Sequence, residues 1–389
     1  MWTIMVHTYL QIFAIAENRF SKIITEKSFI FQIVGNASYT VDTFFFISGF
    51  LVTLLFLRSK SSSKTMTEKG GFVAGTKQSI TLFLYRYIRL TPAYLMVIII
   101  NTVTLKYVYN AAVFTPGLPD HLTCPNYWWR NILYIQTWFP VSQLCMLWAW
   151  YLADDMQFYI FAIPLLILSR RNGKAAISII TTFLLISWIV SALISLKFNY
   201  IHKVSEPLES LGFLYEKPWT RLGPYIMGIL AGYTLNRYKT APSFITPFVN
   251  FVLWLMSMLM LFMLVFGVWN GSLDRAWTAL YVSVGHTAWG LALMWITLSC
   301  KWGLAKPIDK LLSHRTLLPM SRLTYCAYLI HPVSQIVMSL ELKGTVHIQH
   351  GLVLTIFLGN AITAYIIALI ISLLFEAPVV RILKILFGR

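Results

Sequence analysis

The sequence predicts an all-α fold, a polytopic membrane helical bundle of about ten transmembrane helices. Of the 389 residues, 58% are hydrophobic and only 12% are charged, whereas about 25% are charged in a typical soluble domain. Apolar runs of about 20 residues, the length that crosses a bilayer as a helix, also recur between short polar segments. We expect a single domain over 1–389, without a soluble domain beside the helices.

The ten expected helices follow the order of these apolar runs. They are predicted at 1–16, 39–57, 82–106, 147–168, 175–196, 222–236, 244–268, 277–300, 321–341 and 351–375. The first run already begins at Met1, without a basic region before it or a cleavage site after it, so we expect a truncated first helix and not a signal peptide. The segment 59–79 is rich in Ser, Lys and Gly and predicts a mobile cytosolic loop.

The loop charges predict the orientation of the bundle. If successive loops alternate sides, the loops on the side of 59–79 hold 18 Lys or Arg and the others hold 11. Cytoplasmic loops carry the excess of Lys and Arg, so the first set is predicted to be cytosolic. The net charge of +17 is explained by this topology, and no basic arm or motif indicates a nucleic-acid partner. We expect the plasma membrane or the endoplasmic reticulum.

The loops on the predicted outer side carry sequons and cysteines. The sequons NAS at Asn36 and NGS at Asn270 predict glycosylation at both residues. Cys124 and Cys145 both lie in or beside the outer loop 106–146, where a disulfide can persist. We expect a Cys124–Cys145 bridge, and two unpaired thiols are the alternative.

Ionisable residues within the apolar spans are the candidates for a site, because a charge at the centre of a bilayer costs about 2.5–3.5 kcal/mol on insertion scales. In chain order, the candidates are His7, Asp42, Arg86, Arg89, Asp154, Asp155 and His331.

In the first two helices, His7 is a candidate general base, because the ordinary pKa of an imidazole lies near neutral pH. The alternative is a hydrogen-bonded histidine that packs two helices together. Asp42 is a candidate acid or ligand group, but an aspartate beside Thr40 and Thr43 is also a good helix start.

In the third helix, Arg86 and Arg89 lie three residues apart and share one helical face. Guanidinium groups are permanently charged, forked donors that suit phosphate. The pair is therefore a candidate site for an anionic ligand. The alternative is that both side chains reach the lipid headgroups and anchor the end of the helix.

In the fourth helix, only one of the adjacent Asp154 and Asp155 can face a given neighbour. One of them pairs with an arginine, or both are exposed acids at a helix N-terminus, where they favour the dipole. In the ninth helix, His331 precedes Pro332 and either lines a cavity or marks a plain kink. The cysteines and histidines show no metal-ligand spacing, so no metal site is predicted.

The order of several stretches resembles the acyltransferase 3 family of membrane acyltransferases, and most closely its animal branch of nose resistant to fluoxetine protein 6-like proteins. The matching stretches run from residue 2 to residue 378 and include WTIMVHTYLQI, YRYIRLTPAYLM, YCAYLIHPV and the late FEAP. The resemblance implies about ten helices and the transfer of an acyl group, often from acyl-CoA, to an acceptor hydroxyl.

The resemblance also implies roles for four residues. His7, in MVHTY, matches the proposed catalytic base of the family, and Arg86 and Arg89 match its RxxR motif, which makes them the expected acyl-CoA site. Asp155 matches the acid of a WSLxxEEQFY-like stretch, with a shorter carboxylate. The family's arginine eleven residues before the histidine would precede Met1, and the animal members' extracellular cysteine-containing domain would precede it too. The expectation is an incomplete product, or a copy that has lost part of its site.

The sequence therefore predicts an integral membrane O-acyltransferase that moves an acyl group from acyl-CoA to an unidentified hydroxyl-bearing or lipid acceptor. The alternative is a transporter of lipids or xenobiotics, or a transport accessory, that uses the same residues without catalysis. A third possibility is a scaffold in which these residues only pack. The expected partners are the lipid bilayer and acyl-CoA, without a metal or nucleic acid.

Overall fold

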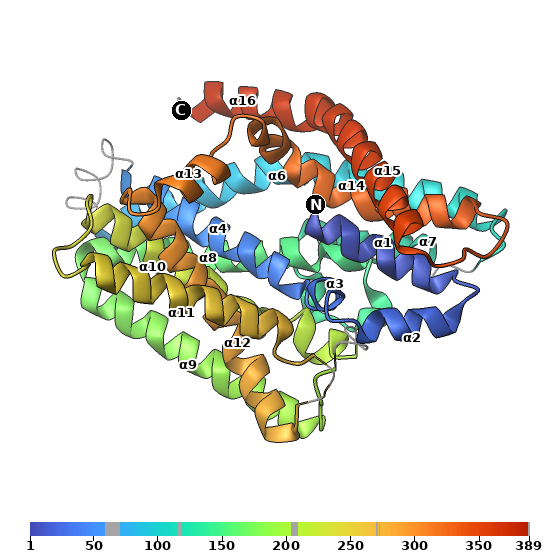
Figure 1. Ribbon diagram of the computed structural model, residues 1–389. Helices are drawn as coiled ribbons and strands as arrows, with labels where there is room; N and C mark the ends of the chain where they lie inside the picture. Colours follow the sequence, from blue (N-terminus) through green and yellow to red (C-terminus); the bar gives the residue numbers. More distant parts are fainter. Residues whose placement is uncertain (59–70, 115–118, 204–208, 270, 272, 388–389) are drawn as a thin grey trace. The chain divides into compact units, whose positions relative to one another are not determined.

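The computed structural model of the chain is helical throughout its ordered elements and has no β-strand in the part that it describes (Figure 1). This confirms the predicted all-α fold. The chain divides into two compact units. The described residues are 1–58, 71–114, 119–203, 209–269, 271 and 273–387.

Eight helical segments among the described residues are long and apolar enough to cross a membrane. They are 38–58, 75–109, 147–171, 173–197, 247–266, 275–301, 317–341 and 350–386. The two other predicted spans correspond to helices α1 (Trp2–Ala14) and α10 (Pro218–Arg237). The 13 residues of α1 are too few to span a bilayer, and the Pro, Gly and Arg residues of α10 lower its hydropathy. The chain is thus an integral multi-pass membrane protein.

The first unit brings the beginning of the chain together with its end. It comprises residues 1–37, 84–153 and 315–389. Helix α1 packs against both α14 (Leu317–Glu341) and α15 (His350–Ile371) (Figure 1). Ile4 of α1 lies against Ala361 and Ala364 of α15. Small side chains such as alanine let membrane helices approach closely. The unit also contains α2 (Arg19–Lys27), α3 (Gln32–Gly35), α7 (Asp120–Ile132) and α16 (Ala377–Phe387).

The second unit, residues 38–83 and 154–314, is built around α10. Helix α10 packs against α4 (Ser38–Arg58), α9 (Gly173–Lys197) and α12 (Arg275–Lys301), and 13 of its 20 residues are buried. Protein, and not lipid, therefore surrounds most of this helix, which explains how it tolerates a less apolar sequence.

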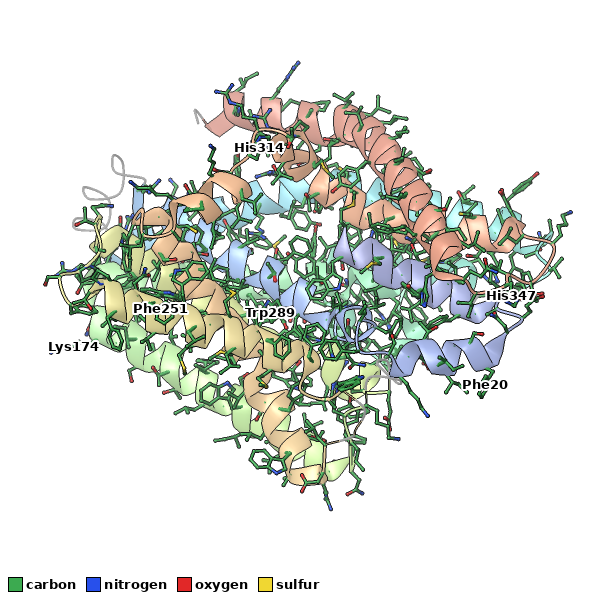
Figure 2. All side chains as sticks on the ribbon, in the orientation of Figure 1. Phe20, Lys174, Phe251, Trp289, His314 and His347 are labelled. Carbon is green, nitrogen blue, oxygen red and sulfur yellow. A yellow bond between two sulfur atoms is a disulfide. The ribbon has the colours of Figure 1, made fainter. Side chains whose placement is uncertain are left out.

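Helix α11 (Pro247–Phe266) has the opposite character. It packs on α12, while Phe248, Phe251 and Leu255 are exposed. Phe251 is labelled on this helix in Figure 2. Exposed apolar residues on a membrane helix face the lipid chains. Helices α6 (Gly71–Tyr109) and α8 (Trp150–Arg171) contribute residues to both units.

The structure describes only residues 71–79 of the predicted mobile loop 59–79. Residues 59–70 lie outside the described residues, and from Gly71 onward the chain is already part of α6. The prediction of a loop is therefore wrong for 71–79. The physical reason is helix cooperativity, since extending an existing helix fixes one residue for each new hydrogen bond and avoids the cost of nucleation.

The predicted disulfide is confirmed, because Cys124 of α7 is bonded to Cys145 of the following loop. Glycosylation at Asn36 and Asn270 is not confirmed. Asn36 lies at the turn between α3 and α4 and is 3% exposed, and its glycosylation stays a prediction. A sequon is a local pattern and does not report burial. Asn270 lies outside the described residues.

Asp120, at the first residue of α7, is a buried acid close to this disulfide. Its carboxylate is 1% exposed and accepts hydrogen bonds from Asn101 Nδ2 at 3.0 Å and from the Met146 N–H at 3.2 Å. Burial outweighs these bonds and raises the pKa of Asp120 from 3.8 to about 6. Between these pH values the folded chain holds a proton that the unfolded chain releases. The folded state therefore loses stability as the pH rises from about 4 to about 6.

Asp120→Asn is expected to abolish this pH dependence. At pH 7 the variant should be more stable than the parent chain by up to about 3 kcal/mol, because a neutral amide avoids the burial of a charge. The amide of Asn101 can turn its oxygen toward the new donor, since Asn101 Oδ1 accepts no hydrogen bond from the residues that the structure describes. The measurement is the thermal midpoint of the purified protein from pH 4 to 7. Asp309→Asn, at an acid that is 42% exposed, is the control, and an unchanged slope in Asp120→Asn would contradict the prediction.

Candidate functional site

Two of the predicted site residues meet in the first unit. They are His7 of α1 and His331 of α14. His7 Nδ1 lies 3.1 Å from His331 Nε2, and the two rings stack with their centroids 4.9 Å apart. His331 is buried, whereas His7 is partly exposed. The two histidines thus form one pair of imidazoles, which we call the histidine pair.

A network of polar side chains holds α1 in place beside the histidine pair. Thr8 is fully buried, and its hydroxyl donates to Ile4 O at 2.8 Å. That hydroxyl oxygen accepts hydrogen bonds from Gln335 Nε2 of α14 and Asn360 Nδ2 of α15, each at 3.1 Å. Gln335 Nε2 also donates to Ile4 O at 3.1 Å. Three helices are therefore joined one residue away from His7, and a small pocket is lined by Thr8, Gln335 and Asn360.

The two arginines of the RxxR motif also belong to the first unit, on α6. Arg86 is partly buried, and the side chain of Arg89 is 49% exposed. Arg89 Nη2 lies 3.8 Å from Glu376 Oε1, and Glu376 accepts further hydrogen bonds from Ser372 at 3.2 Å and Cys326 at 3.4 Å. An anionic ligand of Arg89 therefore has to compete with Glu376. This acid belongs to the FEAP stretch, but its pairing with Arg89 was not predicted.

Asp154 and Asp155 lie on α8 in the second unit. They are 0% and 5% exposed, and α8 begins four residues before Asp154, at Trp150. The alternative that they are exposed acids at a helix N-terminus is therefore wrong. His7 and Asp155 belong to different units, and the catalytic role predicted for each stays a prediction.

A buried charge cluster in the second unit consists of Asp42, Arg221 and His286. Arg221 Nη1 donates to both carboxylate oxygens of Asp42, at 3.2 and 3.3 Å. His286 Nδ1 lies 2.7 Å from Asp42 Oδ2 and 3.0 Å from Arg221 Nη1, so all three side chains of the cluster meet at this nitrogen. Arg221 Nε also donates to Tyr215 O at 3.0 Å. Arg221 and Asp42 are 1% and 0% exposed.

The sequence interpretation identified only one member of this cluster. Asp42 lies inside α4, which begins at Ser38, so the alternative that it starts the helix is wrong. Arg221 directly precedes the predicted span 222–236 and therefore falls outside it. His286 lies within the predicted span 277–300, and the rule that polar residues inside membrane spans mark functional or structural sites would have found it.

These features define the class of the protein: it is a multi-pass helical membrane protein with ionisable side chains buried inside its helical units. A family model described as an acyltransferase domain matches residues 1–379, and the chain belongs to this family, acyltransferase 3. Nose resistant to fluoxetine protein 6 of Caenorhabditis elegans is 30% identical over 413 residues, which cover 100% of this chain and 50% of that protein.

A second similar protein is Regulator of hypoxia-inducible factor 1 of Caenorhabditis elegans. It is 25% identical over 223 residues, which cover 52% of this chain and 41% of that protein. The chain spans about half the length, or less, of these curated relatives. No solved structure matches the chain.

Proposed function

We propose that the chain is an integral membrane O-acyltransferase that transfers an acyl group from acyl-CoA to a hydroxyl acceptor. The observation that carries this proposal is the histidine pair, which holds His7 against His331 in a chain of the acyltransferase 3 family. Arg86 and Arg89 support it, because they lie in the same unit as His7 and offer permanently charged donors.

In the proposed reaction, Arg86 and Arg89 bind the phosphates of acyl-CoA, and the phosphate replaces Glu376 as the partner of Arg89. His7 takes the proton of the acceptor hydroxyl, and the oxygen attacks the thioester carbonyl. The carbon–sulfur bond breaks, the CoA thiolate leaves, and the proton on His7 passes to it. Asp155 stays a candidate catalytic acid through the family resemblance alone.

The alternative function is the transport of a lipid or xenobiotic without bond formation. The observation that favours it is the 30% identity to a relative named for resistance to fluoxetine. In that case the same buried polar residues contact a hydrophobic cargo, and acyl-CoA is not a ligand. In both proposals the protein resides in the plasma membrane or the endoplasmic reticulum and takes a hydroxyl-bearing or lipid substrate.

Arg86→Ala/Arg89→Ala is expected to weaken the binding of acetyl-CoA by more than about tenfold, because each guanidinium contributes charge-assisted hydrogen bonds worth about 1.5–3 kcal/mol. Binding to the parent protein should fall as salt is added. The measurement is a titration of the purified full chain with acetyl-CoA at several salt concentrations.

The matched control for this experiment is Arg381→Ala/Lys384→Ala. These two cations are also three residues apart on a helix, α16, and both are exposed. Equal losses in the two double variants would mean that the binding is non-specific attraction to positive charge. Absence of binding by the folded parent protein would favour transport over catalysis.

A further inference from the structure

The contacts of the histidine pair determine which ring nitrogens donate and which accept a hydrogen bond, beginning with His331 on α14. His331 Nδ1 lies 3.1 Å from Ala327 O, in the preceding turn of the same helix. A carbonyl oxygen can only accept a hydrogen bond, so Nδ1 of His331 carries a proton. In a neutral imidazole the other nitrogen is then an acceptor, and Nε2 of His331 therefore has a free lone pair.

The same reasoning extends across the pair to α1. His331 Nε2 is an acceptor and lies 3.1 Å from His7 Nδ1, so His7 Nδ1 must be the donor. His7 Nε2 is then left without a proton. Both rings are neutral in this order, which suits their position between apolar helices, where a charge is costly.

We propose that His331 is a positioning residue that fixes the tautomer of His7, so that Nε2 of His7 is the basic nitrogen of the site. This inference deepens the proposed function and rests on it in one respect, since the acceptor hydroxyl is what gives Nε2 a proton to take. His331 touches the base and not the reacting atoms. It has the role that an orienting carboxylate has in a catalytic triad, with a neutral acceptor in place of a charged one.

The position of His331 before Pro332 explains how α14 presents this side chain. Pro332 has no backbone N–H, so it cannot bond Tyr328 O, and its ring disturbs the same turn of the helix. The ring of His331 folds back onto this turn, where its Nδ1 bonds Ala327 O. In the His-Pro sequence, the proline thus removes a backbone hydrogen bond from this turn, and the histidine side chain donates a hydrogen bond to a carbonyl of the same turn.

The order of protons also fits the chemistry of the proposed transfer. When His7 Nε2 takes the hydroxyl proton, His7 becomes an imidazolium, and its Nδ1–H bond to His331 becomes charge-assisted and stronger. The hydrogen bond thus stabilises the charged base at the stage when the thioester is attacked. The proton then leaves Nε2 for the CoA thiolate, and the neutral pair is restored.

The direct test reads the two nitrogens of His7 by ¹⁵N NMR of the full chain, labelled at its eight histidines. The signals of His7 are assigned by their loss in His7→Gln. We expect Nδ1 to be protonated and Nε2 to be unprotonated in the parent protein. His331→Phe should shift His7 toward the other tautomer, and His331→Gln should restore the first one, because the glutamine oxygen can accept from Nδ1.

His350→Phe, at an exposed histidine of α15 in the same unit, is the matched control and should leave the His7 signals unchanged. An unprotonated Nδ1 in the parent protein would overturn the inference. So would His7 signals in a folded His331→Phe variant that match those of the parent. These readouts do not depend on activity.

Release of CoA thiol from acetyl-CoA, with ethylene glycol as the hydroxyl probe, separates this inference from the proposed function. His331→Phe should lower kcat about 100-fold with little change in KM, the range for losing general base catalysis, and His331→Gln should recover about tenfold. If the tautomers are as expected but His7→Ala still releases thiol at the parental rate, the proposed function is wrong. The assignment of a proton to Nδ1 of both His7 and His331 is then still correct. A parental kcat in His331→Phe would overturn the positioning role.

Discussion

Replacing Arg221 by methionine is expected to lower the free energy of unfolding by about 3–5 kcal/mol, because removal of one partner leaves a buried, uncompensated charge. Asp42 is fully buried, and it receives two hydrogen bonds from Arg221 Nη1. The desolvation of Asp42 is therefore compensated by groups on other helices, Arg221 of α10 and His286 of α12. The measurement is the unfolding of purified protein in detergent, by heat or by denaturant.

Two further variants test whether the charge itself carries this effect. In Asp42→Asn/Arg221→Met both charges are gone, and much of the lost stability should return, because replacing a whole buried ion pair is often nearly neutral. Lys301→Met removes a cation from an exposed pair with Asp309 and should cost at most about 1 kcal/mol. If Arg221→Met costs no more than Lys301→Met, the buried charge cluster does not hold the second unit together.

The helices of this chain were predictable because the bilayer imposes a length and a composition on each of them. The exceptions show where that rule ends. Helix α10 is surrounded by other helices, and neither its length nor its mean hydropathy indicates which neighbours it packs against. Residues 71–79 have a loop-like composition but continue α6, since a long apolar helix can extend into an adjoining polar segment.

The individual residues of the candidate site were predictable from the sequence, but the contacts between them were not. His7 and His331 were both identified because an ionisable residue in an apolar span needs a reason to be there. Their contact joins residues 324 positions apart, and no local pattern encodes such a distance. Arg221 was missed for a related reason, because it lies just outside a predicted span and is buried where α10 packs on α4 and α12.

Replacing Gly228 by leucine is expected to destabilise the protein by more than about 3 kcal/mol, because α4 and α10 cross there with their backbones in contact. A Cβ atom at Gly228 would overlap Phe46 O and lie 2.8 Å from Phe50 N, and both are backbone atoms that cannot turn away. Gly232, one turn further along α10, meets α4 in the same way, as in other small-xxx-small helix contacts. The measurement is the same unfolding experiment, at matched protein and detergent concentrations.

The control is Gly359→Leu on α15, where a new Cβ would meet no atom of the described residues within 4 Å, so the change should cost little or improve the helix. Arg221 and Gly228 are seven residues apart and share one face of α10, so a wider crossing should also separate Arg221 from Asp42. Gly228→Leu and Arg221→Met should then be less than additive when combined, because each removes part of the same contact. Full additivity would mean that α4 and α10 stay in contact at the charge cluster when the glycine crossing is forced apart.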